Sequence, residues 1–213
     1  MPDMERETVR ASGQSPSQAG RKLVLALGCL LGLGVVAFTD SYWPDEGYVH
    51  EAIEWVGMTL IAICVVGRTW CSLYIGNRKN KEVVQDGPYS VVRNPLYFFS
   101  IIGGFGVGAQ AGGITVSLVC GFLTWAVFSR MAQIEEDHMV ETFGSQYFYY
   151  MMRVPRLWPQ LSLYHSRDSF EVFPAQIVRT FWDASIFFVA VPVMEFFDYL
   201  HGVGTLPTKI WLP

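Results

Sequence analysis

Residues 94–129 read NPLYFFSIIGGFGVGAQAGGITVSLVCGFLTWAVFS, and none of these 36 residues carries a charge. A single helix of that length would measure about 54 Å, whereas a membrane crossing needs only about 20 residues. The middle of the stretch, 108–113, reads GAQAGG, and glycine clusters favour turns. The stretch therefore predicts a tight hairpin of two membrane-spanning helices, at roughly 95–109 and 113–131, with Pro95 in the first turn.

The composition of the whole chain is typical of a membrane protein. Hydrophobic residues make up 51% of the 213 residues, and charged residues only 16%, against about 25% in soluble domains. Residues 23–39 and 55–77 are further apolar stretches that are long enough to span a bilayer. A retained span at 23–39 is favoured over a secretory signal because the polar leader is long and no small-residue cleavage site follows. The net charge of −4 argues against a nucleic-acid partner.

The distribution of Lys and Arg predicts the orientation in the membrane. These residues gather in the N-terminal segment, at 78–93 and at 130–156, whereas 40–54 and the turn of the hairpin contain none. Positively charged loops of membrane proteins face the cytoplasm. We therefore expect an all-α integral-membrane bundle of four to five transmembrane helices, in the inner or plasma membrane of a bacterium or in an endomembrane of a eukaryote.

The pattern divides the chain into three regions. Residues 1–22 are expected to form a disordered polar tail, and residues 23–160 the membrane core. In the C-terminal extension, 161–213, the uncharged stretch 184–194 has only 11 residues, or about 16 Å of helix, against roughly 30 Å of hydrocarbon. It is interpreted either as a short fifth span or as an aromatic-rich helix lying in the membrane interface.

Two polar segments flank the hairpin, GPYSVVRNPLY at 87–97 and EEDHMVETFGSQYFYYMMRVP at 135–155. The first resembles the G-P-Y-x-x-x-R-H-P-x-Y signature of the isoprenylcysteine carboxyl methyltransferase and phospholipid methyltransferase superfamily. The second is similar to the E-E-x-x-L-x-x-x-F-G-x-x-Y-x-x-Y-x-x-x-V-P block of the same superfamily. The order and spacing of the two motifs also fit, and the resemblance covers about residues 55–159.

The resemblance implies a small membrane methyltransferase that uses S-adenosylmethionine. The cofactor pocket would lie at the cytoplasmic membrane face, and a lipophilic small molecule, a lipidated acceptor or a membrane lipid would enter from the bilayer. Catalytic roles fall to Arg93, Glu135 and Glu136. The cofactor-binding positions implied are Tyr89, Asn94, Pro95, Tyr97, Glu135, Glu136 and Tyr147, and Tyr150, Arg153 and Pro155 would shape the wall with Tyr147.

The acceptor chemistry stays open at this point. A carboxylate acceptor would be oriented by Arg93, whereas an amine or a thiol would need Glu135 or Glu136 as a base. Asn94 stands where the superfamily commonly has His, and we expect its amide to contact the cofactor. If this departure marks a lost activity, the chain is instead a non-catalytic membrane scaffold. Helix faces such as Gly104-x-x-x-Gly108 would then mediate its assembly, and they could also form a homo-oligomer.

Three other patterns have competing interpretations. The glycines at 103–108 favour close helix packing, but the backbone at Gly104 and Gly106 could instead approach the adenosine of the cofactor. Arg68 lies within a span, where it either faces a polar partner or extends toward the interface. No metal site is predicted, because Glu135 and His138 form only one of the two E-x-x-H pairs that a di-iron bundle needs.

Overall fold

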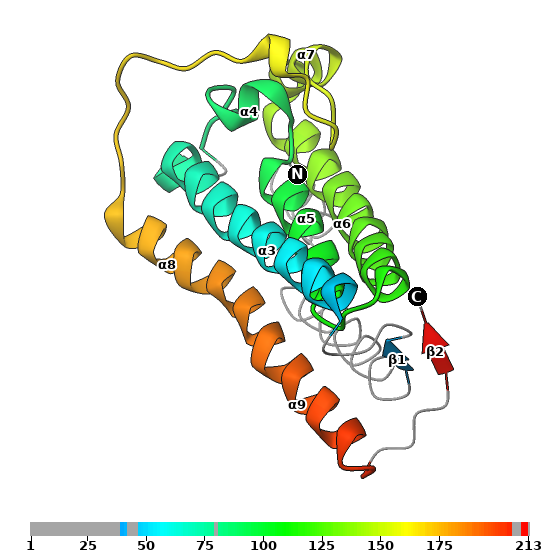
Figure 1. The fold of residues 1–213 in the computed structure, drawn as a ribbon. Helices are drawn as coiled ribbons and strands as arrows, with labels where there is room; N and C mark the ends of the chain where they lie inside the picture. The colour runs from blue at the N-terminus through cyan, green and yellow to red at the C-terminus, as the bar shows by residue number, and fades with distance from the viewer. Residues whose placement is uncertain (1–38, 42–46, 79–80, 206–209, 213) are drawn as a thin grey trace, which may run out of the picture.

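The computed structural model describes residues 39–41, 47–78, 81–205 and 210–212 (Figure 1). Two three-residue strands, β1 (Thr39–Ser41) and β2 (Ile210–Leu212), pair in parallel. Every other element is helical, in the order α3 (Tyr48–Ile75), η1 (Gly76–Arg78), α4 (Pro88–Val91), α5 (Pro95–Ala109), α6 (Ile114–Phe143), α7 (Ser145–Arg153), η2 (Leu161–Leu163), α8 (Pro174–Ser185), η3 (Ile186–Val189) and α9 (Ala190–Gly202). The all-α expectation is confirmed. The expected tail at 1–22 and nearly all of the expected span at 23–39 lie outside the described residues.

The predicted hairpin is formed by α5 and α6. Helix α5 begins at Pro95, which has no N–H to leave unsatisfied in the first turn, and it ends at Ala109 as expected. Gly112 has a φ of +62° in the turn, a backbone conformation that a side chain disfavours. Helix α6 extends to Phe143, twelve residues beyond the expected end. The second motif of the sequence therefore begins on the same helix that forms the second arm of the hairpin.

Glycines allow α5 to pack closely between α3 and α6 (Figure 1). A Cβ added at Gly106 would lie 2.8 Å from the carbonyl oxygen of Gly57 on α3. A Cβ at Gly108 would lie 2.6 Å from the carbonyl oxygen of Val116, and one at Gly104 would overlap the side chain of Thr124, both on α6. Such small-residue faces are how helices approach each other in a bilayer, which favours the packing interpretation of these glycines.

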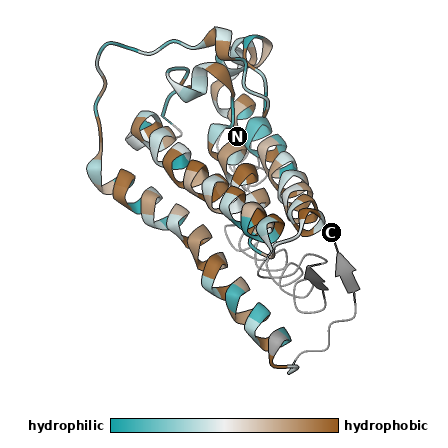
Figure 2. Cartoon of the chain, viewed as in Figure 1, coloured by the Kyte–Doolittle hydropathy of each residue, from teal (hydrophilic) through white to brown (hydrophobic). Residues whose placement is uncertain are grey.

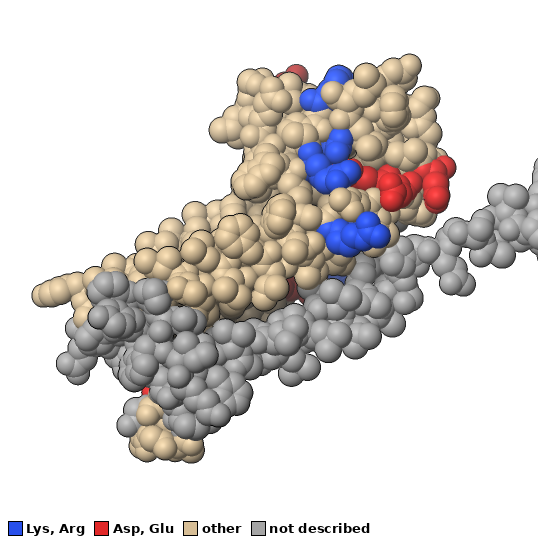
Figure 3. Space-filling view, turned by 90° about the vertical axis from the view of Figure 1, so that its right-hand side faces the viewer, with Lys and Arg blue, Asp and Glu red and all other residues tan. Residues whose placement is uncertain are grey.

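Three helical stretches in the described part of the chain are long and apolar enough to cross a membrane: Tyr48–Ile75, Ile114–Phe143 and Pro174–His201. Helix α5 is apolar but shorter. Hydrophobic residues run along the length of these helices (Figure 2), and the charges visible beside α6 gather toward one end of the described surface (Figure 3). Large apolar side chains such as Phe122 and Trp125 are exposed on α6, where lipid would cover them.

The C-terminal extension forms a longer helix than the sequence suggested. Helices α8, η3 and α9 continue into one another over 28 residues, antiparallel to α3 (Figure 1). The sequence argument took Asp183 and Glu195 as the limits of an 11-residue apolar segment, whereas the helix continues past both residues, whose side chains are exposed. Length therefore no longer argues against a crossing by this segment.

Arg68 of α3 has a polar partner on the neighbouring helix. Its Nη1 donates a hydrogen bond to the hydroxyl of Ser100 on α5, and this hydroxyl donates in turn to the carbonyl oxygen of Leu96 at 2.7 Å. An intramembrane guanidinium is costly without such a partner. Of the two interpretations of Arg68, the contact favours the polar partner.

The close approach of α5 and α3 gives a test of the packing. We expect Gly106→Ala to destabilise the folded protein by roughly 1–3 kcal/mol, since the methyl group has to displace the backbone of α3. Thermal unfolding of the detergent-solubilised protein measures this. Val66→Ala on the exposed face of α3 is the control, with an expected change below about 0.5 kcal/mol. An unchanged melting temperature in Gly106→Ala would contradict the packing role.

Candidate functional site

The two motifs of the sequence meet at one end of the bundle, where α4 and α7 lie near the end of α6 (Figure 1). Backbone hydrogen bonds hold the segment after α7 against the link between α4 and α5. The N–H of Arg93 donates to the carbonyl oxygen of Pro155 at 2.9 Å, and that of Asn94 to the carbonyl oxygen of Arg156 at 3.2 Å. Segments more than 60 residues apart in the sequence are thereby fixed side by side.

Glu136 is the most completely enclosed charged residue of this region, with only 1% of its surface exposed. Arg93 donates to both carboxylate oxygens, from Nε at 3.0 Å and from Nη2 at 3.1 Å. Arg156 donates from Nε at 2.9 Å and Asn94 from Nδ2 at 2.8 Å. Bidentate, charge-assisted bonds of this kind are the strongest hydrogen bonds in proteins. Glu136 is therefore a buried carboxylate whose hydrogen-bonding capacity is filled.

A cavity of about 130 Å³ lies beside this cluster. Its wall contains eight of the expected site residues, namely Tyr89, Arg93, Asn94, Pro95, Tyr97, Glu135, Tyr147 and Tyr150. Other residues of the wall are Ile75, Glu82, Val83, Val84, Leu96 and Met139. Glu136, Gly104 and Gly106 are not part of this wall, and the two glycines lie instead in the helix contacts described above.

The neighbouring carboxylates Glu135 and Glu136 have different surroundings. Glu135 lines the cavity and accepts a hydrogen bond at 2.7 Å from the hydroxyl of Tyr97, whose ring stacks on Phe128 with 5.1 Å between centroids. Successive residues of a helix point about 100° apart, so one side chain faces the cavity while the other faces Arg93. Of the two acids, Glu135 is the one whose side chain a ligand in the cavity could contact.

Tyrosines form much of the remaining wall. The hydroxyl of Tyr89 is buried and has no hydrogen-bond partner among the described residues, and burial raises the pKa of Tyr89, so the group is a neutral donor at physiological pH. Tyr150 donates to the carbonyl oxygen of Tyr89 at 2.6 Å, and its ring meets that of Tyr147 edge-on at 5.6 Å. An aromatic wall with an unsatisfied hydroxyl is suited to a ligand that carries both a cation and polar groups.

Some site residues differ from the sequence expectation. Arg153 donates to the side chain of Gln85 at 2.7 Å and is exposed, so it does not contribute to the wall of the cavity. Pro155 acts through its carbonyl oxygen, which receives the N–H of Arg93. Arg156, the third partner of Glu136, was missed because it follows the last position of the motif.

The sequence model of a family described as phospholipid methyltransferase matches residues 52–146. A cobalt-zinc-cadmium resistance protein of Cupriavidus metallidurans is 31% identical over 84% of this chain and 82% of its own length. A nickel-cobalt-cadmium resistance protein of Alcaligenes xylosoxydans xylosoxydans is 32% identical over 81% of this chain and 80% of its own length.

A third relative is named for an enzyme activity. Protein-S-isoprenylcysteine O-methyltransferase B of Arabidopsis thaliana is 27% identical over 50% of this chain and 59% of its own length. No solved structure matches the chain significantly. The family match spans α5, the first motif and the beginning of the second, so it includes most residues of the cavity wall but not Tyr147 and Tyr150.

The burial of Glu136 predicts a structural role for its charge. We expect Glu136→Gln to lower the free energy of unfolding by about 3–5 kcal/mol, because the guanidinium of Arg93 then stays buried without a compensating charge. Denaturant or thermal unfolding in detergent measures the loss. Glu141→Gln, on the exposed surface of the same helix, should change stability by less than about 0.5 kcal/mol. Equal stability of the two variants would contradict this role.

Proposed function

We propose that this chain, which matches the phospholipid methyltransferase family over residues 52–146, transfers a methyl group from S-adenosylmethionine to a lipophilic acceptor held in the membrane. The single observation that carries this proposal is the cavity at the end of the helical bundle, to which both motifs contribute. The apolar helices and the family match indicate an integral membrane protein, and we expect the acceptor to enter the cavity from the bilayer.

The side chains of the cavity fit the charges of this cofactor. S-adenosylmethionine carries a sulfonium and an ammonium group, and when bound it supplies an electrophilic methyl group. Glu135 offers a carboxylate to one of these cations, and the tyrosines offer aromatic faces. The hydroxyl of Tyr89 offers a hydrogen bond that no described residue uses. The cavity volume of about 130 Å³ is below the roughly 300–1,000 Å³ of ligand sites, so it would hold the methionine end.

The contribution of the protein to methyl transfer would be mostly alignment. The reaction is a displacement at carbon, in which holding the acceptor atom in line with the methyl group supplies much of the rate. Arg93 and Asn94 line the cavity, but their side chains donate hydrogen bonds to Glu136. They would therefore hold the wall of the cavity in place rather than bind a substrate. The carboxylate of Glu135, which accepts a hydrogen bond from Tyr97 in the wall, would accept a proton from an amine or a thiol acceptor.

The function is tested by following the methyl group. Purified protein in detergent, or membranes containing it, is incubated with cofactor labelled in the methyl group, and lipids, small thiols and proteins are then separated. Base-labile label on protein or lipid carboxylates, stable label on lipid amines, and label on thiols distinguish the three acceptor chemistries. Absence of cofactor binding and of transfer in all fractions would favour the scaffold alternative.

Glu135 gives the sharpest test of the cofactor site. We expect Glu135→Gln to weaken binding of S-adenosylmethionine about ten- to hundredfold, as for the loss of a charge-assisted hydrogen bond worth about 1.5–3 kcal/mol. Calorimetric titration of the cofactor into detergent-solubilised protein measures this. Glu141→Gln on the exposed face of α6 should bind as the native protein does. Native affinity and native turnover in Glu135→Gln would contradict its role.

We propose that the cavity faces the cytoplasm, since the described arginines and lysines of 78–93 and 130–156 lie at its end of the bundle. A cysteine replacing the exposed Tyr48 at the start of α3 should react with an impermeant thiol reagent in intact cells. A cysteine replacing the exposed Gln146 of α7 should react only after permeabilisation. The background for both lacks the native thiols Cys29, Cys64, Cys71 and Cys120. The reverse labelling pattern would overturn the orientation.

A further inference from the structure

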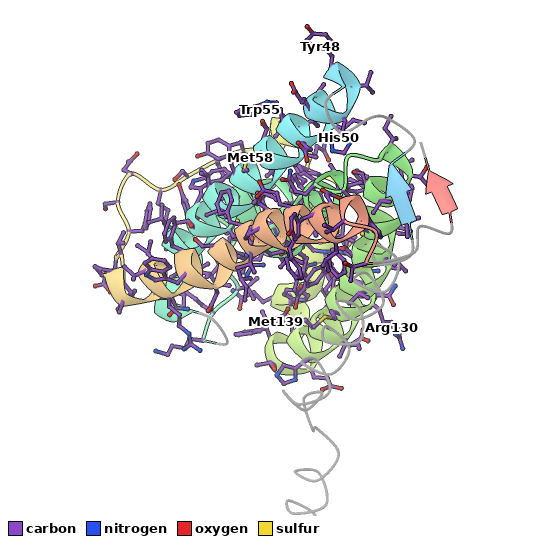
Figure 4. The ribbon with its side chains drawn as sticks, turned by 60° about the horizontal axis from the view of Figure 1, so that its bottom comes forward. Tyr48, His50, Trp55, Met58, Arg130 and Met139 are labelled. Carbon is purple, nitrogen blue, oxygen red and sulfur yellow. The ribbon has the colours of Figure 1, made fainter. Side chains whose placement is uncertain are left out.

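A second cluster of chemically versatile side chains lies at the opposite end of the bundle. His50 and Glu54 are on the first two turns of α3, and Asp198 is near the end of α9. His50 is 25 residues from Ile75 in the wall of the cavity, or about 38 Å along the helix, so the cluster is separate from the proposed methyltransferase site. Figure 4 looks toward this end of the molecule, with His50 on the first turn of α3.

The distances within this cluster fit the ligands of a metal ion. One ligand atom from each of His50, Glu54 and Asp198 can be chosen so that all three atoms lie within 4.8 Å of one another. The Nε2 of His50 is 3.4 Å from Oε1 of Glu54, longer than the roughly 2.7–2.9 Å of a charge-assisted hydrogen bond. Two ligands at about 2.1 Å from a tetrahedral ion are separated by about 3.4 Å. The spacing is thus that of two ligands around one ion.

The imidazole is an independent indication of a ligand. His50 is 4% exposed, and its Nδ1 is buried with no hydrogen-bond partner among the described residues. Its ring packs directly against the turn between α5 and α6, where a Cβ added at Gly112 would overlap it. A buried polar atom without a partner costs free energy. Either ring nitrogen can bind an ion: coordination through Nδ1 would remove this cost, and coordination through Nε2 would place the ion beside Glu54.

We propose that His50, Glu54 and Asp198 bind a divalent transition-metal ion with the coordination preferences of Zn²⁺. Imidazole and carboxylate ligands suit Zn²⁺ and Co²⁺ better than Mg²⁺ or Ca²⁺, which prefer oxygen ligands alone. His50 and Glu54 are four residues apart and therefore on one face of α3. Asp198 completes the set from a helix 148 positions later in the chain, so the ion would fasten α9 to α3.

The test is metal binding by the full-length protein, purified in detergent without a histidine tag and treated with a chelator. We expect about one equivalent of Co²⁺ to bind and to give the visible absorption of a tetrahedral or five-coordinate ion, with Zn²⁺ displacing it. The isosteric variant Asp198→Asn and the variant His50→Gln should each weaken binding at least tenfold. Matched controls are Glu51→Gln and Glu195→Gln, exposed carboxylates on the same two helices, which should bind as the native protein does.

A readout of folding separates loss of a ligand from loss of the fold. Zn²⁺ should raise the melting temperature of the native protein and of both controls, because an ion that binds only the folded state stabilises it. Zn²⁺ should leave the melting temperature of Asp198→Asn unchanged. The proposal is overturned if the native protein binds neither ion at 100-fold molar excess, or if Asp198→Asn and His50→Gln bind as tightly as the controls. Neither result bears on methyl transfer.

Discussion

The buried carboxylate of Glu136 is the constraint on which the described site depends. An ionised group that is 1% exposed is tolerated only when its lone pairs are filled and its charge is balanced. Here the donors come from Arg93, Asn94 and Arg156, which belong to two segments far apart in the sequence. Because satisfying one carboxylate requires both segments at once, the end of α6 can take only one position relative to them.

The cavity follows from that position. Once Arg93 and Asn94 are directed toward Glu136, Tyr89 before them and Tyr97 after them in the first motif join them in the wall. Glu135 differs from its neighbour only by a rotation of about 100° about the helix axis, yet it meets a tyrosine hydroxyl where Glu136 meets two guanidinium groups. Two adjacent acids thereby have different surroundings: Glu136 is enclosed by hydrogen-bond donors, and Glu135 lines the cavity.

The sequence predicted the parts of this arrangement that depend on local signals. A proline and a glycine cluster were enough to place the ends of α5, and the motif spacing brought most of the wall residues together. The different surroundings of Glu135 and Glu136 could not be predicted, because both lie in a charged stretch of α6, 130–141, where the sequence does not show which side faces the bundle. Residues that only the fold brings together, such as Arg156 with Glu136 or Asp198 with His50, are not indicated by any local pattern in the sequence.

The departure at position 94 can now be weighed by what the side chain does. The amide nitrogen of Asn94 donates to Oε1 of Glu136 at 2.8 Å, and the residue is the N-cap that precedes helix α5. A histidine in the same place carries an N–H that can serve the same carboxylate, so the feature shared by the two residue types is a hydrogen-bond donor rather than a titrating group. Since the neighbouring carboxylate is already balanced by two arginines, the site needs no third positive charge from this position. Asparagine therefore preserves the interaction on which the cavity rests, and its presence gives no reason to regard the site as lost.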